Sequence, residues 1–70
     1  MEKFSEFVKE FRLSRGLTQK QLAARMGVNY VSIIKAESGK KVGLKIMNAI
    51  AAYSGVDTQE IRRMMKNEGN

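Results

Sequence analysis

The sequence predicts an all-α fold, a compact bundle of five short helices. Three observations support this prediction: apolar residues recur at helical spacing in five stretches, cap and glycine signals separate those stretches, and proline is absent. The apolar–polar alternation typical of strands is scarce. A chain of 70 residues is expected to form one small domain that buries only about 60% of its unfolded surface. We expect this domain to span residues 1–66 and residues 67–70 to fray.

Two helices are predicted before residue 28. The first spans residues 2–14 and ends at Gly16, and the i, i+3, i+4, i+7 spacing of its apolar face is formed by Phe4, Phe7, Val8 and Phe11. Thr18 then caps the second helix, with Gln21 as its capping-box partner, and Gly27 ends it. We expect the three phenylalanines to lie in the core rather than on the surface, where they could stack on the bases of single-stranded nucleic acid.

Three more helices are predicted after residue 28. Asn29 is a favourable cap for the third helix, which stops near Gly39 and leads into a basic loop over residues 40–43. The fourth helix ends at Gly55, and its apolar face is predicted from Leu44, Met47, Ile50 and Ala51. Asp57 starts the fifth helix, whose apolar residues are Ile61, Met64 and Met65.

The stretch from Thr18 to Glu37 has the pattern of a helix-turn-helix. Two short helices bend around Gly27, and the inward-facing apolar set is Leu22, Ala23, Met26, Val28, Ile33 and Ala36. The second helix of a helix-turn-helix lies in the major groove of DNA. The pattern therefore predicts a DNA-reading helix between residues 29 and 38.

The positive charge of the chain is concentrated in its middle. Residues 11–56 carry a single acid, Glu37, against eight bases, so this segment is more positive than the whole chain, whose net charge is +6. The eight bases are Arg12, Arg15, Lys20, Arg25, Lys35, Lys40, Lys41 and Lys45. A polyanion such as duplex DNA would therefore meet the helix-turn-helix region rather than a charged tail.

The composition disfavours several other function classes. The chain has no cysteine and no histidine, so it lacks thiolates, the commonest metal ligand and the usual general base. Its acids lie mostly near the ends, and no catalytic constellation can be assembled from them. No apolar run approaches the ~20 residues of a membrane span, and no signal peptide is visible. We expect a cytoplasmic protein that is not an enzyme and has no metal, cofactor or membrane partner.

Several motifs resemble those of a known family. They are Gly16-Leu17-Thr18-Gln19, Leu22-Ala23, Met26-Gly27-Val28, Ile33 and Glu37-x-Gly39-Lys40. Over about residues 4–65 the chain resembles the five-helix DNA-binding domain of the Cro and phage-repressor type, the xenobiotic-response-element family. The resemblance implies a transcription regulator that binds operator DNA as a dimer. The loop after Gly39 departs from the family because it is about one residue shorter and lacks the common proline.

The resemblance also implies roles for individual residues. Gln19 would contact phosphate from the start of the second helix, and Lys40 would do so just past the third. Lys41 is expected to join Lys40 on phosphate, because both lie beside the recognition helix with one acid nearby in sequence. Arg12 and Glu37 would form a salt bridge between the first and third helices. The positions of the third helix that face bases and backbone are Asn29, Tyr30, Val31, Ser32 and Lys35.

Some of these positions allow two interpretations. Ile33 and Ile34 are adjacent and cannot both face the core, so we assign Ile33 to the core and expect Ile34 to point outward with Tyr30 and Val31. That outward apolar face either contacts thymine methyls or packs against a loop or a partner protein. Asn29 either caps the helix only or also contacts a base.

The sequence thus predicts sequence-specific binding of duplex DNA by a transcription regulator, with repression as the expected effect. A homodimer on a near-palindromic operator is expected, with its interface near the fourth and fifth helices, where Ile61, Met64 and Met65 supply apolar surface. Met64 and Met65 belong either to that interface or to the core. A regulatory partner protein is a further expected partner. The alternative is a protein-interaction adapter or antitoxin-type module that uses the apolar face of the third helix.

Overall fold

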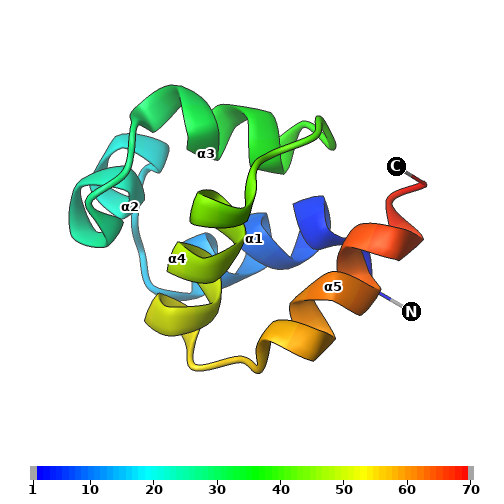
Figure 1. Cartoon of the computed structure of the whole chain (residues 1–70). Coiled ribbons are helices and arrows are strands. Elements are labelled where there is room, and N and C mark those ends of the chain that lie inside the picture. Colours follow the sequence, from blue (N-terminus) through cyan, green and yellow to red (C-terminus); the bar gives the residue numbers. More distant parts are fainter. Residues whose placement is uncertain (1, 70) are drawn as a thin grey trace.

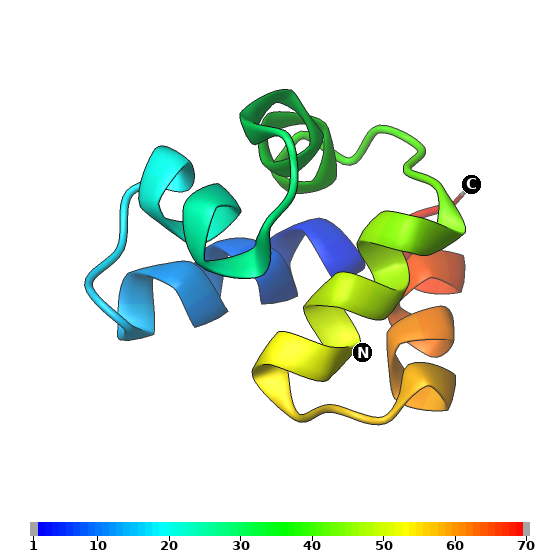
Figure 2. The ribbon, with the colours of Figure 1, turned by 60° about the vertical axis from the view of Figure 1, so that its left-hand side comes forward.

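The computed structural model describes residues 2–69; residues 1 and 70, which belong to the expected domain and tail, lie outside the described residues. Residues 2–69 contain no strand and five helices: α1 (Phe4–Ser14), α2 (Gln19–Met26), α3 (Tyr30–Glu37), α4 (Leu44–Ser54) and α5 (Thr58–Asn67). The predicted all-α bundle is therefore confirmed. α2 and α3 lie together on one side of α1, and α4 pairs with α5 (Figures 1 and 2).

The core lies where the five helices meet. Ile33 of α3 and Ile61 of α5 are completely buried, and Leu22 of α2 and Val8 of α1 are 1% exposed. The assignment of Ile33 to the core is confirmed. The remaining buried apolar residues are Phe4, Leu17, Ala23, Ala36, Ile46, Met47, Ile50, Ala51 and Met64. Because α3 contributes to this core and also packs on α1 and α2, its orientation in the bundle is fixed by these contacts.

The aromatic side chains of α1 pack inward. Phe4 is 3% exposed, and Phe7 and Phe11 are half-buried against the core. The rings of Phe7 and Phe11 stack with their centroids 6.1 Å apart, and Phe11 meets Tyr53 of α4 edge-on at 5.8 Å. The prediction that these rings are core rather than exposed platforms is therefore confirmed.

The predicted apolar face of α4 was wrong at one position. Leu44 is 67% exposed, and Ile46 takes a place in the core instead, together with Met47, Ile50 and Ala51. Leu44 is the first residue of α4, directly after the N-cap Gly43.

The expectation that α5 offers surplus apolar surface for a dimer was also wrong for two of its three residues. Ile61 is completely buried and Met64 is 4% exposed, and Met65 is half-buried against the same core. The physical reason is that α5 closes the bundle against α1 and α4, so its apolar face is used within the chain.

Both ends of the bundle differ slightly from expectation. α1 begins at Phe4 rather than at residue 2, and α5 extends to Asn67, one residue past the expected boundary. Glu68 is the C-cap of α5. Within residues 2–69, no helix combines the length and the hydropathy that crossing a membrane requires.

Candidate nucleic-acid interface

The bend between α2 and α3 is determined by backbone geometry at Gly27. Gly27 has φ +69°, a left-handed conformation that favours glycine. Its amide donates to Ala24 O at 3.2 Å, and the amide of Val28 donates to Ala23 O at 3.0 Å. These two bonds form a Schellman motif, which satisfies the last carbonyls of α2 and turns the chain toward α3.

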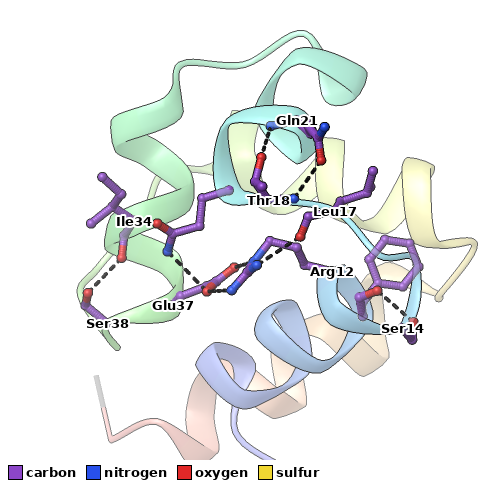
Figure 3. Close-up of polar contacts among 10 residues, drawn as sticks. Arg12, Ser14, Leu17, Thr18, Gln21, Ile34, Glu37 and Ser38 are labelled. Atoms are coloured by element: carbon purple, nitrogen blue, oxygen red, sulfur yellow. Dashed lines mark hydrogen bonds and ion pairs between the residues drawn. The ribbon is translucent and has the colours of Figure 1, made fainter.

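Side-chain caps start both helices of the motif as predicted. Thr18 Oγ1 accepts from the Gln21 amide at 3.1 Å, and Gln21 Oε1 accepts from the Thr18 amide at 2.9 Å (Figure 3). Asn29 Oδ1 accepts from the Val31 amide at 2.8 Å. The oxygen of Asn29 is thus used for capping, while its amide nitrogen, the donor group, is not part of the cap.

Arg12 and Glu37 lie together between α1 and α3. Arg12 Nε is 2.7 Å from Glu37 Oε2, and Arg12 Nη2 is 3.0 Å from Glu37 Oε1, so the pair is bidentate (Figure 3). The side chains are only 12% and 5% exposed. Arg12 Nη1 also donates to Leu17 O at 2.9 Å, and the hydrogen bond to Glu37 raises the pKa of Arg12 above its ordinary value. The pair therefore ties α1, the turn before α2 and the end of α3 together.

Gln19 also contacts Glu37, and sequence patterns did not predict this contact. Gln19 Nε2 donates to Glu37 Oε1 at 3.2 Å and the side chain is half-buried. An amide nitrogen carries two hydrogens, so one is held by Glu37 and one remains for another acceptor. Glu37 thereby orients a donor group at the first residue of α2, the position at which a phosphate contact is expected.

The start of α3 presents exposed side chains. Tyr30 is 37% exposed, Val31 is 50% exposed, and Asn29 and Lys35 are also exposed. Ser32 and Ile34 are half-buried. In Figure 3, Ile34 points away from the Arg12–Glu37 pair. The outward apolar face therefore consists mainly of Tyr30 and Val31, and Ile34 is less exposed than expected.

Lys20 lies against Tyr30, a contact that sequence patterns did not predict. Its Nζ lies 5.4 Å from the centroid of the Tyr30 ring, a cation–π distance that links α2 to the start of α3. Lys20 is exposed and follows Gln19 directly. Its place among the eight bases of the middle segment was the only sequence signal, because the neighbourhood of Tyr30 depends on how α2 packs against α3.

Lys40 and Lys41 occupy the loop that follows α3. Gly39 has φ +78°, and the amide of Lys40 donates to Lys35 O at 3.0 Å, so the chain reverses directly at the end of α3. Lys40 and Lys41 are both exposed. The turn therefore keeps both lysines within a few residues of the end of α3.

The middle segment offers a surface of uncompensated positive charge. Within residues 2–69 there are two ion pairs, Arg12–Glu37 and Arg63–Glu60. Glu37, the one acid of residues 11–56, is paired with Arg12. The other seven bases of this segment are exposed and belong to neither ion pair: Arg15, Lys20, Arg25, Lys35, Lys40, Lys41 and Lys45. Exposed positive charge attracts polyanions, and three of these bases, Lys20, Arg25 and Lys35, lie on α2 and α3 themselves.

The five-helix bundle, the left-handed bend and the exposed third helix define a helix-turn-helix protein. A family model described as helix-turn-helix matches residues 8–61, and the chain belongs to that family, the Cro/C1 type. Its members are DNA-binding transcription regulators rather than enzymes, so the chain is a DNA-binding transcription regulator. No curated protein and no solved structure matches it.

Proposed function

We propose that the chain binds specific sequences of duplex DNA as a homodimer on a near-palindromic operator and represses transcription there. The observation that carries the proposal is the exposed start of α3, with Tyr30 37% and Val31 50% exposed, in a chain segment that carries seven exposed bases outside the two ion pairs. Phosphate contacts from Gln19, Lys40 and Lys41 would set the register, and α3 would read base edges in the major groove.

The base-reading part of the proposal rests on the chemistry of two side chains. Val31 carries two methyl groups, which suit contact with a thymine methyl. Tyr30 adds a ring and a hydroxyl that can donate to a phosphate or a base edge. Asn29, Ser32 and Lys35 provide polar groups on the same helix, and Ile34 is a smaller apolar contributor because it is half-buried.

Replacing Tyr30 tests the base-reading role. We expect Tyr30→Ala to relax preference at one or two operator positions and to weaken the best site by roughly 1–3 kcal/mol. Selection of bound sequences from a random duplex library, with the wild type and Tyr30→Phe in parallel, measures the preference at each position. Tyr30→Phe separates the hydroxyl from the ring. An equal loss on all sequences would show that Tyr30 contacts the backbone instead.

The dimer follows from the small number of base pairs that one helix can read, too few to select a site in a genome. Two half-sites should be centred about 34 Å apart, one turn of DNA. Inserting about five base pairs between them puts the half-sites on opposite faces and should abolish cooperative binding. One protein bound per site, with no dependence on spacing, would refute the dimer. Of the three residues expected at the α5 interface, Met65 alone is half-buried rather than buried. Comparing operator binding of Met65→Lys with that of the wild type tests whether Met65 contributes to the interface.

A protein-interaction adapter or antitoxin-type module is the second candidate, favoured by the exposed apolar residues Tyr30 and Val31. A regulatory partner protein would use the same face. Binding to duplex DNA at two salt concentrations separates the candidates, because counterion release gives a DNA reader a steep salt dependence. Weak binding without salt dependence would favour the adapter.

A further inference from the structure

Glu68, at the C-terminal end of α5, reaches the first turn of α1. Its Oε1 accepts from the amide of Ser5 at 2.8 Å, across 63 positions of sequence. Ser5 is the second residue of α1 and is only 9% exposed, so its amide has no acceptor within the helix and little access to water. Hydrogen bonds from the Ser5 hydroxyl and from the Ser5 amide hold the pKa of Glu68 below its ordinary value. Glu68 thus supplies a charged acceptor to a buried donor.

The same carboxylate contacts the loop that follows α3. A Cβ atom added to Gly39 would lie 3.0 Å from Glu68 Oε2, so the carboxylate occupies the space directly beside this glycine. Gly39 directly precedes Lys40 and Lys41, which are expected to bind phosphate. Glu68 is therefore placed between the start of α1 and the loop that carries those two lysines.

A small cavity marks this junction. It has a volume of about 90 Å³, and its walls are Phe4, Gly39, Lys40, Lys41, Val42, Met65 and Glu68. Phe4 and Met65 provide apolar walls from α1 and α5, and residues 39–42 form the wall that faces them. The space next to the loop is therefore not filled by side chains, and Glu68, the C-cap of α5, is one of the residues that line it.

We propose that Glu68 is a positioning residue for DNA binding, which anchors the loop of residues 39–42 to α1 so that Lys40 and Lys41 face phosphate together. This inference rests on the proposed phosphate contacts of those lysines. Carboxylates repel phosphate, so an acid beside a DNA-binding loop is unfavourable unless it has a structural role. The Ser5 contact and the close approach to Gly39 provide that role. Glu68 itself is not expected to touch DNA.

One matched pair of variants and one conservative variant test the proposal. Glu68→Ala and Glu60→Ala remove one negative charge each from the same helix, but Glu60 pairs with Arg63 on the exposed face of α5. Amide hydrogen exchange of the free protein is measured at residues 39–42, and duplex binding is measured at several salt concentrations. Glu68→Gln serves as the conservative variant, because it keeps an acceptor oxygen for Ser5 while it removes the charge.

We expect Glu68→Ala to speed exchange at residues 39–42 by about tenfold relative to Glu60→Ala, the effect of losing one charge-assisted hydrogen bond. Duplex affinity should fall about threefold below that of Glu60→Ala, with a smaller salt slope because the lysines no longer act together. Glu68→Gln should restore most of the protection. Equal exchange and equal affinity in the two alanine variants would overturn the proposal, as would a change in global stability alone.

A substitution at Gly39 provides an independent test that does not need DNA. Gly39→Ala places a methyl group against Glu68 Oε2 and also strains the backbone at φ +78°. The strain is the same with or without Glu68, so it cancels in a double-mutant cycle. We expect Gly39→Ala to open the loop less in the Glu68→Ala background than alone. Additive effects would show that Glu68 does not hold Gly39. If Lys40→Ala and Lys41→Ala leave the salt slope unchanged, the proposed phosphate contacts fail, while the exchange data still decide whether Glu68 holds the loop.

Discussion

Glu37, at the end of α3, joins three helices, because its carboxylate accepts hydrogen bonds from side chains of α1 and α2. It holds Arg12 of α1 in a bidentate pair, and it accepts from Gln19 at the start of α2. Its own position is at the end of α3. A single buried acid therefore neutralises one base of a strongly positive segment and orients the first side chain of α2. The remaining bases stay exposed and available to a polyanion.

We predict that breaking the Arg12–Glu37 pair is strongly destabilising. Both side chains are largely buried, so Glu37→Gln or Arg12→Met alone should cost about 3–5 kcal/mol, because the other charge is left uncompensated. The double variant should lose less than the sum of the two single losses. Denaturant unfolding of all four proteins measures this coupling. Additive losses would mean that the pair contributes nothing as a pair.

A second prediction at this scale concerns Lys40 and Lys41. Each substitution by alanine should weaken binding similarly on all duplex sequences and lower the salt slope by about 1, because one phosphate contact is lost. Lys9→Ala is a suitable control, since Lys9 is exposed on α1 and lies outside the positive segment. An unchanged slope in both lysine variants, with binding otherwise intact, would place the phosphate contacts elsewhere.

At the scale of an element, α3 combines a local start signal with a tertiary anchor. Its N-terminus depends on the Asn29 cap, and its inner face is held by the completely buried Ile33 and Ala36. The exposed first turn is therefore held in place by buried side chains, which suits the proposed role of matching the edges of nucleobases closely. Lys20 of α2 adds a cation against Tyr30, so the two helices of the motif share one exposed surface.

The two interpretations of Asn29 can be separated by one pair of variants. Asn29→Ala should cost about 1 kcal/mol of stability through the lost cap, and Asn29→Ser should retain most of that stability because serine also caps well. Thermal unfolding checks this part. If Asn29 also contacts a base, Asn29→Ser should still lose sequence preference at one operator position. Full DNA specificity in Asn29→Ser would limit Asn29 to the cap.

At the scale of the whole molecule, the two ends of the described chain meet. Glu68 binds Ser5, and Asn67 Nδ2 donates to the backbone oxygen of Glu2 at 3.3 Å. Contacts between sequence-distant segments constrain a small bundle more than local contacts do. Glu68 also lies beside Gly39, so the contact that closes the two ends of the bundle is next to the loop that follows α3.

Stability should therefore fall in acid through Glu68. Its pKa is lower in the folded protein than its ordinary value of 4.5, so its contribution is present above that value and is lost as the pH falls through the lower folded pKa. Nearby Lys3 supports the same direction, whereas hydrogen bonding with Glu10 raises the pKa of Glu2 and acts with the opposite sign. The free energy of unfolding in urea is measured for the wild type and Glu68→Gln from about pH 3 to pH 7, a range that includes the ordinary pKa of carboxyl groups. The difference between the two curves gives the contribution of Glu68 to the pH dependence. Parallel curves would contradict this prediction.

The sequence by itself determined the features that depend on neighbouring residues. The Thr18–Gln21 capping box, the Asn29 cap and the left-handed turn at Gly27 each involve positions no more than five apart, so local residues are sufficient to specify them. The order of the five helices and the core position of Ile33 followed from the same local patterns. The exposure of Tyr30 and Val31 also agrees with the helical period.

Only the tertiary structure decided what depends on how the helices meet. The exposure of Leu44, the burial of Ile61 and Met64, and the half-buried state of Ile34 reflect which neighbours cover each helix, and helical spacing alone does not contain that information. The contacts of Gln19 with Glu37 and of Glu68 with Ser5 span 18 and 63 positions. Such contacts form only when the chain has closed on itself, because their partners share no local pattern before folding brings them together.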